Sequence, residues 1–435
     1  MNDGNIIKMV SQSQILNKKE LDENINFVLS VAHRLVPDSK DIKKLRTLPV
    51  SKNLAFTDGW TWISLPDWAS DIVPKNKKGL FVPSQIDSPD WRNYNWWLGA
   101  SMLIKSSAER KHEIENGPIH SNSYKLDAKM MPSFDYAWTN RIILFLRRWW
   151  SYDNNILEKK AFSPIPKAII HLTHDVDAVS KTLAIRSKQA IFSLYNGRVK
   201  AAVKFLFSYG NYWQFEKITN LEEGYGYRSL WNFYGARGGF FRSLKEHIFD
   251  PAYNIGECRL KKQIRKLAVK GHKIGLHPSF DAWQDCNKMI LEKENIEKSL
   301  GQKITAVRQH WLRFSFSHTW KSQKAAGLKH DFTLGFNDRF GFRNSTAFSF
   351  NDPLSGIKVT PLLLMDSHLF DYSNKNKQER YQAIDAILDE LQITGGEGSV
   401  IWHQRVFHSD YGWGDTYEYL LKGMRKRKIT TPENV

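Results

Sequence analysis

From residue 167 onward, short apolar runs alternate with longer segments of helical periodicity, and this alternation constrains the fold more than any other feature of the sequence. Strands separated by helices must lie parallel, because each helix carries the chain back across the sheet before the next strand begins. The sequence therefore predicts an α/β sheet or barrel. The predicted strands are 168–173, 239–242, 273–277, 306–310, 332–336, 357–364 and 400–403, and the helices between them include 259–269, 286–300, 319–326 and 378–391.

Seven strands suit an incomplete or distorted (β/α) barrel, in which the chemistry lies at the carboxyl ends of the strands. Polar side chains capable of catalysis do gather at these ends, which predicts an active site rather than a packed core. They are Asp175 and Asp177 after the first strand, His277 and Asp281 after the third, Arg308, His310 and Arg313 at the fourth, Asp331 at the fifth, and Trp402 and His403 at the last.

Residues 1–160 are predicted to form a separate N-terminal α+β domain, and residues 161–435 the domain with the polar strand ends. The boundary lies in 151–166, a polar stretch with two prolines. A helix is expected at 18–35, where apolar residues recur at helical spacing. Nine of the 16 tryptophans lie in the first 150 residues. Core packing is expected to account for most of them, and sugar stacking or a membrane interface for others.

Asp175 and Asp177 stand two apart on an extended segment, so their carboxylates point the same way and repel unless a cation lies nearby. A bound divalent metal relieves that repulsion, although a solvated strand end is the simpler interpretation of the pair alone. His277 adds an imidazole, and oxygen plus imidazole suits zinc or another first-row divalent ion. Asp281, four residues after His277, supplies a third ligand if the segment turns helically there.

His403 ends the last predicted strand and is a candidate general acid, because the pKa of histidine is naturally close to the working pH. A metal, a carboxylate base and an imidazole acid together predict a hydrolase. In this hypothesis the metal polarises a carbonyl, Asp175 removes the proton of a water molecule, and His403 protonates the leaving nitrogen.

Five segments in this order, THDVD, GHKIGLHPSFD, VRQHWLRF, DFTLGF and VIWH, resemble the motifs of the polysaccharide deacetylase family with the NodB homology fold, which is similar to carbohydrate esterase family 4. The resemblance covers about residues 167–420 and looks closest to the WbmS-like branch, whose members are encoded with bacterial surface-polysaccharide genes. It implies a distorted (β/α)7 barrel and metal-dependent removal of an N-acyl group, usually acetyl, from an amino sugar.

The resemblance also implies roles for single residues. Asp175 matches the catalytic base, Asp177 and His277 match metal ligands, and the metal is zinc, with cobalt, manganese or nickel as alternatives. Arg308 matches the arginine that orients the base, with Arg313 as a competitor, and Asp331 and His403 match the fourth and fifth motifs. Ile401 would wall the acyl pocket beside Trp402. Asp281 stands where the family has a second histidine, and Ser279 is another candidate for that place. His310 is a nearby alternative acid or ligand, and we expect His310 and Arg313, with Ile401 and Trp402, to contact the substrate.

The formal net charge is +18 and the pI about 9.6, which suits nucleic acid, an anionic membrane, a phosphorylated substrate or simply a solubilising surface. Residues 178–215 contain six Lys or Arg and no acidic residue, with apolar residues interleaved. Such a pattern is typical of a helix on an anionic membrane surface, and equally of a helix whose apolar face packs on the barrel.

The first residues, MNDGNIIKMVSQSQ, lack a basic start followed by an apolar core, which favours a cytoplasmic enzyme, with a peripheral position on the inner membrane as an alternative. We therefore expect an amino-sugar substrate linked to a nucleotide or a lipid, used in O-antigen or capsule assembly. The alternatives are a sugar N-deformylase of the same fold and an inactive glycan-binding protein. Nucleic-acid binding is a remote alternative, because no zinc-finger, RNA-recognition or helix-turn-helix signature is present.

Overall fold

The computed structural model describes residues 17–51, 59–84, 90–181, 183–195, 197–208, 210–236, 243–373 and 375–432. The chain divides into two compact units. Unit 1 comprises Met1–Ile169, Leu334–Leu363 and Ala386–Gly398, and unit 2 comprises Ile170–Thr333, Leu364–Asp385 and Ser399–Val435. The predicted domain boundary at residues 160 and 161 stays a prediction. Among the described residues, no helix combines the length and the apolar character that a bilayer span requires.

Unit 1 combines helices with short antiparallel strand pairs, in keeping with the predicted α+β class. Strand β1 (Trp60–Ile63) pairs with β2 (Leu80–Pro83), and β8 (Phe350–Asn351) pairs with β9 (Lys358–Val359), each antiparallel. Its helices are α2 (Lys18–Val31), α3 (Ser39–Leu45), α4 (Trp96–Ile104), α5 (Ser107–Asn116), α6 (Trp138–Asp153) and α7 (Glu158–Ala161).

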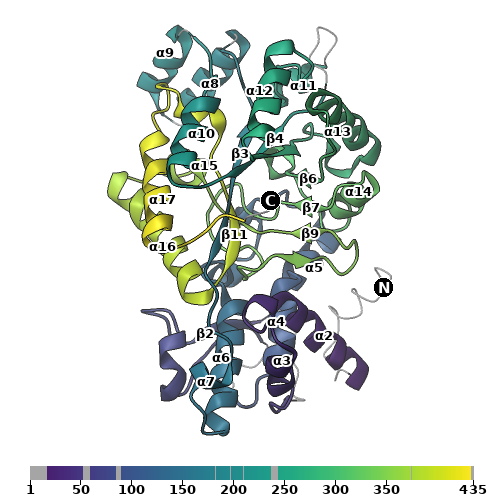
Figure 1. Cartoon of the computed structure of the whole chain (residues 1–435), viewed down its shortest axis with the longest axis vertical. Helices are drawn as coiled ribbons and strands as arrows, with labels where there is room; N and C mark the ends of the chain where they lie inside the picture. Colours follow the sequence, from purple (N-terminus) through teal and green to yellow (C-terminus); the bar gives the residue numbers. More distant parts are fainter. Residues whose placement is uncertain are drawn as a thin grey trace. The chain divides into compact units, whose positions relative to one another are not determined.

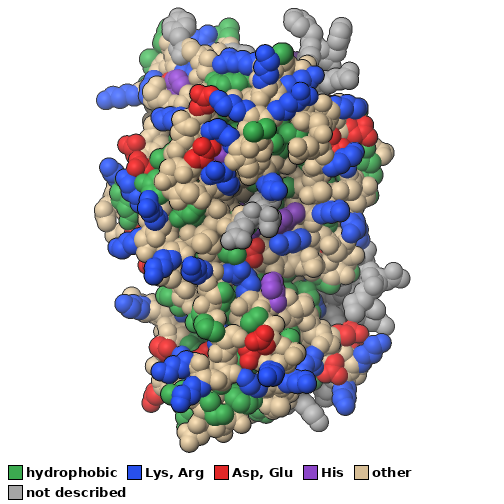
Figure 2. Space-filling model, in the orientation of Figure 1, with side chains coloured by type: hydrophobic (Ala, Val, Ile, Leu, Met, Phe, Trp, Pro, Cys, Tyr) green, Lys and Arg blue, Asp and Glu red, His purple; other side chains and the backbone are tan. Residues whose placement is uncertain are grey.

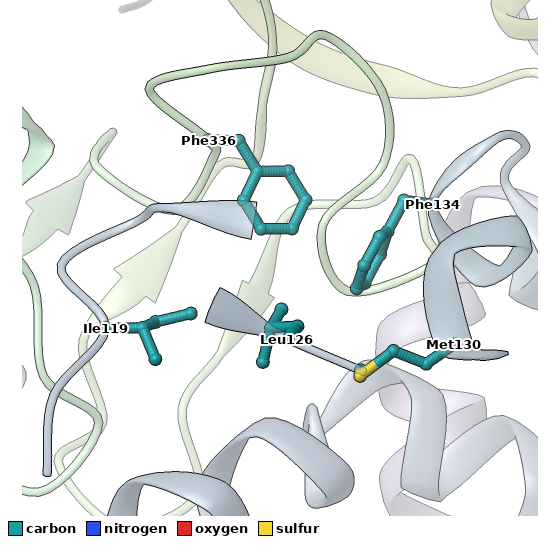
Figure 3. Close-up of a cluster of buried hydrophobic side chains, with 5 residues drawn as sticks. All are labelled: Ile119, Leu126, Met130, Phe134 and Phe336. Atoms are coloured by element: carbon teal, nitrogen blue, oxygen red, sulfur yellow. The ribbon is translucent and has the colours of Figure 1, made fainter. Parts of the chain in front are cut away.

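Local sequence signals account for the first helix and for the aromatic core of unit 1. Asn17 and Glu20 form a capping box that starts α2. Five of the nine tryptophans in the first 150 residues are buried, at Trp91, Trp96, Trp97, Trp138 and Trp149, and the other four are half-buried. Core packing therefore explains this group, as expected. A second cluster of buried side chains comprises Ile119, Leu126, Met130, Phe134 and Phe336 (Figure 3). The ring centroids of Phe134 and Phe336 lie 4.8 Å apart.

Parallel strands form the sheet that carries unit 2 (Figure 1). In spatial order they are β10 (Leu362–Met365), β11 (Glu397–Ile401), β3 (Ile169–Val176), β4 (Ser229–Phe233), β5 (Lys273–Leu276), β6 (Ala306–Val307) and β7 (His330–Asp331). Neighbours from β3 to β7 pair parallel. The segment that follows β7 lies beside β10, the first strand in this order. The N–H of Leu362, at the start of β10, donates to the carbonyl of Leu334 at 2.8 Å. The seven strands thus form the predicted α/β fold, a distorted (β/α)7 barrel.

Helices connect these strands, and the last helix, α17, follows the final strand β11. They are α8 (Leu183–Tyr195), α9 (Val199–Phe207), α10 (Phe215–Gly224), α11 (Leu244–Phe249), α12 (Cys258–Val269), α13 (Cys286–Leu300), α14 (Thr319–Ala325), α15 (Asp366–Phe370), α16 (Lys377–Thr394) and α17 (Gly414–Lys426). The four helices predicted between strands correspond to α12, α13, α14 and α16. Their ends agree within one residue, except that α16 ends at Thr394, three residues later than predicted.

Several strand predictions differ from the structure. The predicted strand 239–242 lies outside the described residues, whereas β4 was missed, since its five residues are buried without alternation. The predicted strand 357–364 is divided into β9 and β10, because Pro361 has no N–H to donate between them. The predicted strands 306–310 and 332–336 correspond to the short pairs β6 and β7, and the chain after each turns into loops that carry polar residues.

Candidate functional site

Three side chains that could hold a metal ion meet at the carboxyl ends of β3, β5 and β6. Asp177 follows β3, His277 follows β5, and His310 begins the short 3₁₀ helix after β6. One ligand atom from each lies within 4.8 Å of the others. His277 Nε2 is 2.7 Å from His310 Nδ1 and 3.4 Å from Asp177 Oδ1, and His310 Nδ1 is 3.8 Å from Asp177 Oδ1.

Backbone carbonyls fix the orientation of both imidazoles. Nδ1 of His277 lies 2.8 Å from the carbonyl of Arg308, and Nε2 of His310 lies 2.7 Å from the carbonyl of Phe249. A proton on each of these nitrogens would leave a lone pair on the other nitrogen of each ring, and these two nitrogens lie 3.4 and 3.8 Å from Asp177 Oδ1. Asp177 Oδ1 is itself buried and has no hydrogen-bond partner among the described residues. One carboxylate oxygen and two imidazole nitrogens within 4.8 Å of one another fit a first-row divalent metal.

The loop that presents His310 is strained. Trp311 and Leu312 adopt left-handed backbone angles, with φ of 56° and 48°. Residues other than glycine adopt this region at a cost, and such strain is concentrated at functional sites. The strained turn brings His310 beside His277, which is why His310 completes the donor set.

Asp175 lies on β3 beside this group and is fully enclosed. Its Oδ1 accepts hydrogen bonds from Asn232 Nδ2 at 2.8 Å and from Arg308 Nη1 at 3.1 Å. Burial alone would raise the pKa of Asp175, but the positive charges of Arg308 and the nearby histidines outweigh it and lower the pKa. Arg308 is buried and also bonds the carbonyl of Phe332 at 3.0 Å. Asp175 is therefore an ionised carboxylate in a fixed position.

His403 approaches from the end of β11 and is held by Asp366. Its backbone N–H donates to Asp366 Oδ2 at 2.7 Å, and its Nδ1 lies 2.8 Å from Asp366 Oδ1. Its other ring nitrogen, Nε2, is 3.6 Å from Asp177 Oδ2. Burial would lower the pKa of His403, but the carboxylates of Asp366 and Asp177 raise it. The imidazole can therefore carry a proton on the side that faces the donor group.

Three residues of this arrangement were not singled out in the sequence, namely Asn232, which donates to Asp175, and Asp366 and Arg405. Asp366 begins α15 directly after β10, so the rule that directed attention to the other strand ends would have found it. Arg405 donates to Asp177 Oδ2, and it lies two residues after His403. Arg405 binds Oδ2 of Asp177, and Oδ1 is the oxygen that lies near His277 and His310.

Asp281 is not brought to the donor group, and His310 stands where the sequence placed Asp281. The carboxylate of Asp281 is 43% exposed and pairs with Lys245 at 2.6 Å and with Arg313 at 2.7 Å. Two cations thus already balance its charge at the surface. Arg313 stacks on Phe280, with 4.1 Å from Cζ to the ring centroid. It therefore belongs to this surface group and not to the pair that orients Asp175.

The remaining predicted residues are buried around the site. Asp331 accepts hydrogen bonds from Trp320 and Gln323, and burial raises its pKa. It is placed to act on Arg308 through its charge and not by contact. Ile401 and Trp402 are buried, and the N–H of Trp402 donates to the carbonyl of Thr173 at 3.0 Å. Trp402 thus contributes a backbone link that keeps the chain after β11 beside β3.

Comparisons with families of proteins and with curated proteins find no match. Among solved structures, the chain is similar to a protein from Mycobacterium smegmatis assigned as a polysaccharide deacetylase (14% identity, 63% of this chain and 96% of that chain, TM-score 0.36). It is similar to a polysaccharide deacetylase from Bacillus cereus (13%, 61% and 90%, TM-score 0.30). A family 4 carbohydrate esterase from Streptomyces lividans is also similar (9%, 61% and 91%, TM-score 0.31). Because these TM-scores are low, we base the proposals on the site geometry and the sequence motifs.

Proposed function

We propose that the protein is a metal-dependent hydrolase that removes an N-acyl group, an acetyl group in the first instance, from an amino sugar used in bacterial surface-polysaccharide assembly. The observation that carries this proposal is the buried Asp177 Oδ1, which has no hydrogen-bond partner among the described residues and lies 3.4 Å from His277 Nε2 and 3.8 Å from His310 Nδ1. A buried carboxylate oxygen without a partner is costly, and a bound cation removes the cost. The five motifs in the sequence imply the same chemistry.

Asp177, His277 and His310 would hold the metal, for which zinc is the first choice and cobalt, manganese or nickel are alternatives. When bound, the metal supplies Lewis-acid polarisation and a more acidic water molecule. Asp175 would accept a proton from the attacking water at Oδ2, since both of its hydrogen bonds go to Oδ1. His403, oriented by Asp366, would deliver a proton from Nε2 to the leaving nitrogen.

Metal content and acyl release, measured together, test these roles. We expect Asp177→Ala, His277→Ala and His310→Ala to lose both the metal and activity after loading and dialysis, and Asp175→Asn to retain the metal but lose activity. Asp281→Ala is the matched control and should retain both, because its partners are Lys245 and Arg313. Release of formate instead of acetate would change the acyl group and not the mechanism. Full metal retention by His310→Ala would refute the proposed donor set.

We also propose a cytoplasmic protein that contacts the inner membrane through α8 and α9. The inner faces of these helices pack around Ala190, Ala202 and Phe205, yet a second apolar set is exposed. Its members are Leu183, Ile191, Leu194, Tyr195, Val199, Val203, Leu206 and Phe207. Neither helix contains an acidic residue. Lys200 and Lys204 are exposed, whereas Arg186 is half-buried and donates to the carbonyl of Leu206 at 3.0 Å. Exposed apolar and basic side chains on one helical pair are typical of a contact with anionic lipid.

The substrate in this proposal is an amino sugar linked to a nucleotide or a lipid, and nucleic acid is not a partner. On the face in Figure 2, Lys and Arg side chains are scattered among the other side chains and do not form one stripe, whereas a nucleic-acid-binding face usually gathers them. We propose an accessory role for residues 1–160.

A further inference from the structure

A cavity of about 330 Å³ in unit 2 lies apart from the metal-binding residues. Its volume falls within the roughly 300–1,000 Å³ of small-ligand pockets. Three cationic side chains and no carboxylate line it. The lining residues are Arg198, Phe370, Ser373, Lys375, Arg380 and Trp413.

The cationic side chains of this cavity are supported by the surrounding structure. The guanidinium of Arg380 lies over the ring of Phe370, with 4.0 Å from Cζ to the centroid, and Phe370 stacks on Trp413 at 4.3 Å and 6°. Nε of Arg380 donates to the carbonyl of Leu369 at 3.2 Å. The two terminal nitrogens of Arg380 have no hydrogen-bond partner among the described residues and remain available as donors for a ligand.

Hydrogen bonds to the segment after α15 hold Arg198 in place. It lies just before α9, and it donates to Asp371 Oδ1 at 2.9 Å and to the carbonyl of Phe370 at 2.5 Å. Burial lowers the pKa of Arg380, and the positive charge of Arg198 lowers it further, so the two guanidiniums repel each other. The carboxylate of Asp371 offsets part of the positive charge of Arg198, to which it is paired, but not that of Arg380. An anion bound between the guanidiniums would relieve the repulsion, and Arg is well suited to bind phosphate oxygens in pairs.

The short helix α15 connects this cavity with the catalytic residues. Asp366 at its first position holds His403, and Phe370 at its last position lines the cavity. Five helical residues span about 6 Å at 1.5 Å per residue. This backbone span is comparable to the length of a sugar phosphate.

We propose that the cavity binds the phosphate that links the amino sugar to its carrier, an assignment that rests on the proposed function for the sugar itself. The ligand chemistry is a sugar-linked phosphate or diphosphate. Its source is either a nucleoside diphosphate or a prenyl diphosphate lipid, and both offer the same anionic oxygens to Arg198, Lys375 and Arg380.

Binding of inorganic pyrophosphate, measured by calorimetry at fixed salt on the full chain, tests the cavity without requiring catalysis. We expect Arg380→Gln to weaken binding about 10- to 100-fold, as befits the loss of charge-assisted hydrogen bonds. Arg339→Gln is the matched control, because Arg339 is a partly exposed arginine of unit 1 that pairs with Asp135, and it should bind as wild type does. Equal binding by Arg380→Gln and wild type would overturn the proposal.

Kinetics connect the cavity to the substrate. With a diphosphate-linked amino sugar, Arg380→Gln should raise KM about tenfold or more and change kcat little, because the contact is remote from the bond that breaks. With the same sugar lacking phosphate, the variant should match wild type. Equal effects on both sugars would overturn the inference and leave the hydrolase proposal intact.

If pyrophosphate binds but no sugar is hydrolysed, the proposed function fails instead. Tighter binding of a nucleoside diphosphate or of a short prenyl diphosphate identifies the carrier.

Discussion

Glu292 on α13 is a buried carboxyl whose ionisation should make the stability of unit 2 depend on pH. It is 1% exposed, and it accepts hydrogen bonds from the N–H and the hydroxyl of Ser279 at 2.8 and 2.5 Å. Burial raises the pKa of Glu292 from 4.5 to about 7, although the bonds from Ser279 oppose this. Because Ser279 stands two residues after His277, Glu292 also fixes the loop that follows β5.

The direction of the pH effect follows from this raised pKa. The folded protein keeps the proton on Glu292 up to about pH 7, whereas the unfolded chain releases it near pH 4.5. The stabilising contribution is therefore fully present below about pH 4.5 and is lost as the pH rises through about 7. At about 1.4 kcal/mol for each pH unit between the two pKa values, the loss is on the order of 3 kcal/mol, most of it between about pH 5 and pH 8.

Thermal unfolding of wild type and Glu292→Gln measures this loss, since glutamine is neutral at every pH and close in shape. For a unit of about 200 residues, the Tm of the variant relative to wild type should rise by roughly 5–10 °C between about pH 5 and pH 8. Glu294→Gln is the matched control, on the same helix but exposed and paired with Lys298, and its Tm difference should stay constant. A constant difference for Glu292→Gln as well would refute the reasoning.

Two further predictions concern the site and the membrane. Asp366→Asn should retain the metal and lower kcat about 100-fold or more, because His403 loses the carboxylate that orients its proton; a fall of less than about threefold would contradict that role. Leu194→Ser combined with Phe207→Ser should reduce flotation with phosphatidylglycerol vesicles roughly tenfold or more. Val269→Ser, which alters a side chain 89% exposed on α12, should float as wild type does, and equal flotation of all three proteins would exclude the proposed contact.

The sequence could predict which strand ends carry the candidate site residues, because in parallel sheets the carboxyl ends lie along one edge. That rule indicated Asp177 and His277, and the structure places their side chains 3.4 Å apart. It could equally have indicated Asp366, which follows β10. The rule failed to separate Asp281 from His310, because the choice depends on loop conformation and not on strand position.

The backbone conformation that places His310 beside His277 cannot be predicted from sequence patterns. Left-handed backbone at a non-glycine residue is uncommon, and here two such residues, Trp311 and Leu312, follow one another. The missed strand β4 had a second consequence, since Asn232 on that strand donates to Asp175. A buried strand without alternation of polar and apolar residues carries no periodic signal. The contribution of β4 to the site could therefore not be predicted from the sequence.

Strand β3 shows why the site can be rigid before any ligand binds. Successive side chains on a strand point to opposite faces, and Thr173 and Asp175 both accept hydrogen bonds from Arg308. His174 points the other way, and its Nε2 lies 2.8 Å from the buried carboxylate of Glu222. The strand that carries the proposed base is thus held by polar contacts on both faces. A carboxylate fixed in this way need not reorganise as charge develops during the reaction, and such preorganisation is a large part of what a protein contributes to catalysis.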